Sequence, residues 1–159
     1  MTSHLSWISR FDVHGIANPV DETPDVVNEK LEQMERHIQK IRRKRAYDLA
    51  KYMNESYVTD RSRRIMFLRG DYFDAKLSAQ RLVRHFEVKR ALFGDGEVLG
   101  RDVLLSDLNP LDIRALESGY LQVLPSRDSS GRLIFSMAPM FRPPEIDVIN
   151  GVSVLVDCW

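Results

Sequence analysis

The chain has one cysteine, Cys158, among its 159 residues. A single cysteine excludes an internal disulfide and is compatible with a reducing cytosol. No apolar run approaches the roughly 18–20 residues that span a bilayer, so no transmembrane segment is predicted. The first residues do not have the basic start and apolar block of a secretory signal. We therefore expect a cytoplasmic protein that is at most peripheral to membranes.

Residue patterns for catalysis or for metal and cofactor binding are also scarce. Metal sites need clustered ligands, whereas the histidines are widely separated, and Cys158 has no neighbours typical of an activated nucleophile. The glycines of residues 94–100 follow a predicted helix rather than a strand, which favours a helix stop over a phosphate-binding loop. We expect neither an enzyme nor a cofactor or metal site. The four histidines are His4, His14, His37 and His85.

Positive charge is concentrated in the middle of a chain whose net charge is zero. Residues 36–90 contain 16 Lys and Arg but six Asp and Glu. Such a segment attracts phosphate-rich partners, although long basic side chains also simply solvate the outer faces of helices. From charge alone, we predict a surface that contacts anionic membranes. Its seven residues are Arg42, Arg43, Lys44, Arg45, Arg61, Arg63 and Arg64.

Apolar periodicity predicts a bundle of three helices. The first starts near residue 25 and runs for roughly 25 to 30 residues, with a possible bend at 42–45 where its apolar stripe shifts. Thr59 or Asp60 caps a second helix that reaches Leu68. Asp74 caps a third that ends near Phe93, before Gly94. On the third helix Ala75, Ala79, Leu82, Val83 and Phe86 form the predicted buried face, and Arg81, Arg84 and Lys89 point outward.

The pattern changes after residue 100. A capped short helix reaches Glu117, and two segments with β character, 120–124 and 133–137, flank a turn-rich spacer. Residues 152–157 form one further candidate strand. The predicted class is α+β and predominantly α-helical: a helical bundle, then a short β-hairpin.

Residues 67–74 read Phe-Leu-Arg-Gly-Asp-Tyr-Phe-Asp. This resembles the F-L-R-A-R-x-F-D motif in the helical N-terminal segment of CRAL-TRIO lipid-binding and lipid-transfer proteins, with Gly70 and Asp71 departing from it. Two further stretches follow in the family's order. One is the step from Leu116 to Pro125, and the other is Arg127-Asp128 before Gly131-Arg132. The similarity spans residues 60–137.

The resemblance implies a helical segment followed by an α/β domain whose apolar pocket holds a hydrophobic lipid, such as a phosphatidylinositol. It divides the chain into a flexible N-terminal arm (1–24), the bundle (25–100), the beginning of a lipid-binding domain (101–142) and a divergent tail (143–159). Only 27 residues follow Arg132, whereas the family's pocket domain needs on the order of 150. The resemblance therefore implies a truncated form without most of the pocket, so no ligand-contact residue is carried over.

Three hypotheses follow. The first is a lipid-binding or lipid-transfer protein whose basic bundle touches anionic membranes. The second is a helical protein-interaction module without a ligand. A basic nucleic-acid-binding domain comes third, because aromatic residues interleaved with the basic ones and a recognisable binding motif are both missing.

Overall fold

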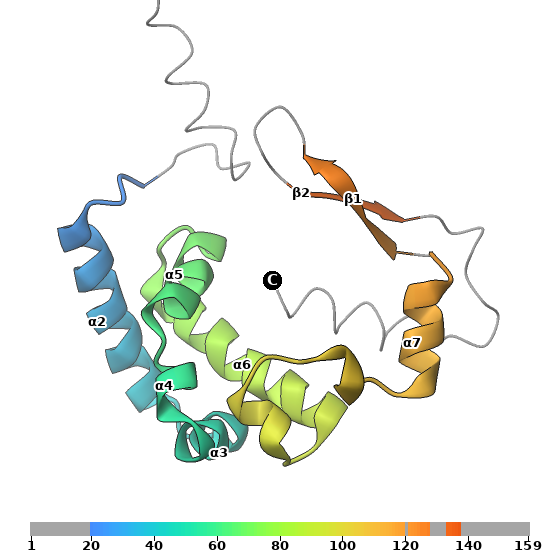
Figure 1. Ribbon diagram of the computed structural model, residues 1–159. Helices are drawn as coiled ribbons and strands as arrows, with labels where there is room; N and C mark the ends of the chain where they lie inside the picture. Colours follow the sequence, from blue (N-terminus) through green and yellow to red (C-terminus); the bar gives the residue numbers. More distant parts are fainter. Residues whose placement is uncertain (1–19, 120, 128–132, 138–159) are drawn as a thin grey trace, which may run out of the picture. The chain divides into compact units, whose positions relative to one another are not determined.

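The computed structural model describes residues 20–119, 121–127 and 133–137. They divide into two compact units, Val20–Val103 and the described residues that follow it. This part of the chain is predominantly helical with a small two-stranded antiparallel sheet, which confirms the predicted mixture of helix and strand. The elements are α2 (Pro24–Lys40), α3 (Arg45–Met53), α4 (Glu55–Val58), α5 (Arg61–Gly70), α6 (Ala75–Phe93), η1 (Glu97–Gly100), η2 (Leu105–Asp107), α7 (Pro110–Glu117), β1 (Leu121–Arg127) and β2 (Leu133–Met137) (Figure 1).

Helix α6 is the central element of the first unit. It packs against α2, α3, α5 and η1, and Asp74 caps its start by accepting hydrogen bonds from the amides of Lys76 (2.9 Å) and Leu77 (3.0 Å). Gly94 ends it with φ 76°, as predicted. All five residues of its predicted inner face are buried, and Phe86 is fully enclosed. The cap, the length and the buried face of this helix are therefore confirmed.

Lys89 corrects the predicted outer face of α6. Arg81 and Arg84 are exposed as expected, but Lys89 is only 4% exposed. Its ammonium group donates a hydrogen bond of 2.9 Å to the hydroxyl of Tyr57 and another to the carbonyl of Arg101. These partners offset the loss of water around a buried charge.

The first predicted helix is broken in two at the predicted bend near residues 42–45. The position of the bend is confirmed, whereas the predicted length of one helix of 25 to 30 residues is wrong. α2 ends at Lys40, and Ile41 takes an extended backbone conformation (φ −75°, ψ 113°) while its amide still bonds to Ile38. α3 begins only at Arg45. The four charged residues from 42 to 45 supply no apolar side chain to continue the buried stripe, so the chain changes direction here.

The turn between α5 and α6 holds two bulky residues in the left-handed region, Tyr72 (φ 53°) and Phe73 (φ 61°). This conformation is unfavourable for residues with a Cβ atom. Phe73 is held there because its side chain is buried (5% exposed) and its amide donates to the Leu68 carbonyl at 2.7 Å. The side chain of Tyr72 is 63% exposed.

In the second unit α7 has a complete capping box. The side chain of Asn109 accepts from the amides of Leu111 (2.8 Å) and Asp112 (3.0 Å), and the Asp112 carboxylate accepts from the Asn109 amide (3.3 Å). This helix ends at Glu117, as the sequence predicts.

Strands β1 and β2 pair antiparallel, with Val123 opposite Phe135 and a register shift between Val123 and Arg127. The two predicted β segments therefore pair with each other. The predicted strand at 152–157, the tail at 143–159 and most of the N-terminal arm lie outside the described residues.

We expect Tyr72→Asn to raise the free energy of unfolding by up to about 1 kcal/mol, because Asn tolerates the left-handed region better than Tyr. Phe73→Asn relieves the same backbone conformation but removes a buried aromatic side chain, so it should lower stability by about 3 kcal/mol. Urea denaturation followed by circular dichroism measures both. Equal effects of the two substitutions would contradict this account of the turn.

Candidate functional site

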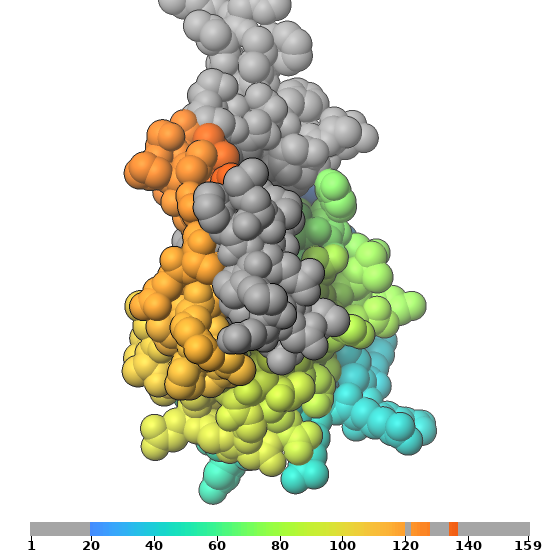
Figure 2. Space-filling model, turned by 90° about the vertical axis from the view of Figure 1, so that its right-hand side faces the viewer, coloured from blue at the N-terminus to red at the C-terminus, as the bar shows by residue number. Residues whose placement is uncertain are grey.

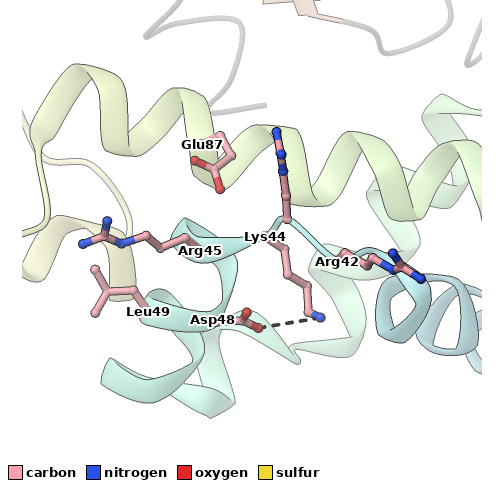
Figure 3. Close-up of a pocket in the computed structure, with 7 residues that line it drawn as sticks. Arg42, Lys44, Arg45, Asp48, Leu49 and Glu87 are labelled. Carbon is pink, nitrogen blue, oxygen red and sulfur yellow. Dashed lines mark ion pairs between the residues drawn. The ribbon is translucent and has the colours of Figure 1, made fainter.

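Four consecutive cations mark the point where α2 gives way to α3. We call Arg42, Arg43, Lys44 and Arg45 the basic corner. With Asp48, Leu49 and Glu87 they line an open depression of about 870 Å³ (Figure 3). Long side chains from the region around residue 40 also project from the lower surface in Figure 2. The depression is lined by four basic and two acidic side chains, so its net charge is positive.

The cations of the corner differ in how far they are neutralised. Lys44 donates to the Ile41 carbonyl at 3.1 Å, and its ammonium lies 4.0 Å from the Asp48 carboxylate. Arg42 and Arg43 are exposed, and neither guanidinium has an ion pair or hydrogen bond within the described part of the chain. These two charges are therefore available to an external anion.

Arg45 is exposed but acts on an acidic neighbour. The pKa of Asp95 is lowered chiefly by its hydrogen bond with Arg90, and the positive charge of Arg45 lowers it further. Arg45 thus adds positive charge to the corner, but part of its electrostatic effect acts on Asp95 rather than on an external ligand.

Glu87 on α6 is an acidic residue that the sequence did not single out. Its carboxylate accepts a hydrogen bond of 3.0 Å from the amide of Ala46, in the first turn of α3. Lys44 precedes this helix and gives it no side-chain cap. Glu87 therefore takes the place of a local cap and neutralises the positive end of the α3 dipole. No local pattern could reveal this, because the partners are 41 residues apart.

The structure does not bring all seven predicted cations to one surface. Arg61 is exposed at the start of α5. Arg63 lies 4.0 Å above the Tyr57 ring and pairs with Asp102 at 2.7 Å, so its charge is largely neutralised within the protein.

Arg64 corrects the predicted surface most clearly. It is 8% exposed and pairs with Glu35 at 2.8 Å while donating to the Tyr47 hydroxyl at 3.2 Å. Its guanidinium faces the interior of the helical unit and cannot meet a membrane in this conformation.

A second group of polar residues holds η1 and the residues after it, 97–103, against the helices. We call residues 97–103 the strap. Asn54 donates to the Gly100 carbonyl at 2.9 Å, Lys89 donates to the Arg101 carbonyl, and Arg63 pairs with Asp102. A Cβ atom on Gly100 would lie 3.2 Å from that of Asn54. These contacts fasten the strap to α5, to α6 and to the junction of α3 and α4 at Asn54.

His85 lies beside this group and between aromatic rings. Its ring centroid is 5.2 Å from that of Phe86 and 5.6 Å from that of Phe67. Its pKa is lowered to about 4, chiefly by burial and also by the charges of Lys89 and Arg63, while the charge of Asp102 acts in the opposite direction. Its Nε2 atom is buried without a hydrogen-bond partner among the described residues. At neutral pH this half-buried imidazole is uncharged.

Two depressions of the helical unit are open rather than enclosed. The one at the basic corner is lined mostly by charged residues, and a smaller one of about 380 Å³ lies between Glu87 and Asp95. Within residues 20–119 and the two strands, no helix has both the length and the apolar character needed to cross a bilayer.

No family model, curated protein or solved structure matches this chain. The resemblance to CRAL-TRIO proteins consequently stays an expectation from the motif residues.

His85 predicts a loss of stability in acid. Its pKa is about 4 in the folded protein against 6.5 normally, so the unfolded chain binds the proton first as pH falls. The contribution of neutral His85 to the free energy of unfolding is fully present above pH 6.5 and is lost as pH falls towards 4. We expect His85→Leu to gain roughly 2 kcal/mol relative to the parent chain between pH 7 and pH 4.5.

Urea denaturation at the two pH values measures this difference. Comparing the two proteins at each pH cancels the carboxylates that they share. An equal loss of stability in both proteins would contradict the burial of a neutral His85.

Proposed function

We propose that the helical unit binds the anionic surface of a membrane through the basic corner. The observation that carries this proposal is the pair of exposed arginines, Arg42 and Arg43, whose guanidiniums have no acidic partner among the described residues. Lys44 and Arg45 extend the same positive surface. A surface cation that already forms an ion pair attracts an external anion less strongly than an unpaired one. Arg42 and Arg43 are of the second kind among the described residues.

Such binding is peripheral and reversible. Each Lys or Arg close to an anionic leaflet contributes about 1 kcal/mol, and the attraction fades within a Debye length of about 8 Å at physiological salt. The cytoplasmic leaflet carries the anionic lipids, including phosphatidylinositol derivatives. This surface therefore suits a cytoplasmic protein that meets membranes transiently.

The resemblance to CRAL-TRIO proteins extends the proposal to lipid binding or transfer. An acyl chain needs a closed apolar pocket, since each buried methylene is worth about 0.8 kcal/mol. The two open depressions described above do not offer one, so the proposal of a bound lipid is supported by the resemblance. Native mass spectrometry of the purified chain tests for a bound lipid. If no lipid is found, lipid binding and transfer are ruled out, but membrane binding through the basic corner is not.

The other two hypotheses give different results with vesicles. A protein-interaction module would not bind anionic vesicles at any salt concentration. A nucleic-acid binder would show affinity for a DNA or RNA probe that falls steeply with salt. Flotation with vesicles of phosphatidylcholine, with and without phosphatidylserine or phosphoinositide, separates these outcomes.

Arg42→Ser with Arg43→Ser should weaken binding to vesicles that contain phosphatidylserine. Losing two charges at about 1 kcal/mol each corresponds to roughly a 30-fold loss at low salt. The effect should shrink as salt is added, because screening already weakens the parent protein. Co-sedimentation over a salt series measures it.

The matched control is Lys76→Ser with Arg84→Ser, which removes two exposed cations from α6. This variant has the same net charge as the Arg42/Arg43 variant. If both variants lose the same affinity, overall charge rather than the basic corner controls binding, and the proposal is wrong.

Glu87→Gln should strengthen vesicle binding roughly fivefold, since it raises the charge of the corner by one. The amide oxygen of Gln can still accept the hydrogen bond from Ala46, so the start of α3 stays capped. Circular dichroism checks that the fold is retained. Unchanged or weaker binding by a folded variant would contradict the role of the corner.

A further inference from the structure

The side of α3 that faces away from the core carries Arg45 of the basic corner and the exposed side chain of Tyr52. With about 100° between successive helical residues, Arg45 and Tyr52 lie within about 20° of each other. Leu49 lies between them along the helix, but its side chain is half-buried and packs against the core. The buried residues Ala46, Tyr47 and Ala50 occupy the opposite side. Figure 3 shows Arg45 and Leu49 extending to the same side of α3.

Tyr52 is the most exposed of the large hydrophobic residues described, at 89%. Its neighbour Met53 is 41% exposed, while Tyr47 on the other side of the same helix is 2% exposed. A tyrosine this open contributes nothing to the core. Its apolar ring and polar hydroxyl are suited to an environment that is apolar at one end and wet at the other.

We propose that the outward face of α3, formed by Arg45 and Tyr52, lies in the interfacial layer of a lipid bilayer. The inference rests on the proposed function and adds an apolar contact to the electrostatic one. The adjacent arginines contact lipid phosphates while the Tyr52 ring enters between the headgroups. A helix with cations and an aromatic residue on one outward face binds in the plane of the membrane in this manner.

The dimensions suit this arrangement. Arg45 and Tyr52 are separated by seven residues, roughly 10 Å along the helix axis. The headgroup region on each side of a bilayer is several ångströms deep, because about 30 Å of the total 40–45 Å is hydrocarbon. If α3 lies parallel to the surface, both side chains reach this layer at the same depth. Membrane binding then has a component that salt does not remove.

The test compares four full-length proteins on vesicles of phosphatidylcholine and phosphatidylserine over a salt series. They are the parent chain, Arg42→Ser with Arg43→Ser, Tyr52→Ser and Tyr72→Ser. We expect Tyr52→Ser to weaken binding roughly fivefold by the same factor at every salt concentration. The arginine variant should lose most at low salt. Tyr72 is the matched control, since it is an exposed tyrosine on a different turn.

A depth measurement complements the affinities. Tyr52→Trp and Tyr72→Trp are each made with Trp7→Phe and Trp159→Phe, so that each protein has one indole. Lipids with brominated chains should quench the Tyr52→Trp variant and shift its emission to the blue, and should leave the Tyr72→Trp variant unchanged. Equal quenching of the two variants would overturn the inference. Circular dichroism confirms that each variant is folded.

The outcomes distinguish the inference from the proposed function. If the arginine variant binds more weakly but Tyr52→Ser binds like the parent chain, the basic corner meets the membrane and the outward face of α3 does not. If the parent chain fails to bind these vesicles, both proposals are wrong, and the exposed Tyr52 becomes a candidate contact for a protein partner.

Discussion

Helix α6 has to bury one face against three other helices while its polar residues reach backbone groups on neighbouring segments. Phe86 and Leu82 are fully enclosed, and the adjacent Glu87 and Lys89 bind the start of α3 and the strap. Apolar packing is not directional, so it could not by itself fix how α3 lies on α6. The hydrogen bond that the Ala46 amide donates to the Glu87 carboxylate does so. The position of the basic corner therefore depends on a side chain that belongs to α6.

The break between α2 and α3 determines which charges meet the solvent. In one continuous helix, residues 42–45 would point in successive directions around the axis, about 100° apart. The extended backbone at Ile41 removes them from that repeat and gathers them around an open depression. Glu87 supplies the negative charge that the start of α3 requires. The remaining positive charge lies on flexible side chains, which can adjust to a surface of mobile headgroups.

Local sequence patterns anticipated the parts of the fold that depend on neighbouring residues. The caps at Asp60 and Asp74, the end of α6 at Gly94 and the buried face of α6 follow from contacts within one or two helical turns. The buried locations of Arg64 and Lys89 depend instead on partners far away in the sequence. A long basic side chain turns inward when a remote segment offers a carboxylate, hydroxyl or carbonyl, as Glu35 does for Arg64. The charge count of residues 36–90 could thus locate a basic region but not tell available cations from satisfied ones.

Asn54 ends α3 and begins α4. Its side-chain oxygen accepts from the Tyr57 amide at 3.2 Å, and its nitrogen donates to the strap at Gly100. The last turn of α3 is thereby fastened at its end, immediately after Tyr52 and Met53, where helices usually fray. A side chain on an ordered helical turn loses little backbone conformational entropy when it binds another surface. Because the last turn of α3 is already ordered in the free protein, binding through Tyr52 costs less conformational entropy.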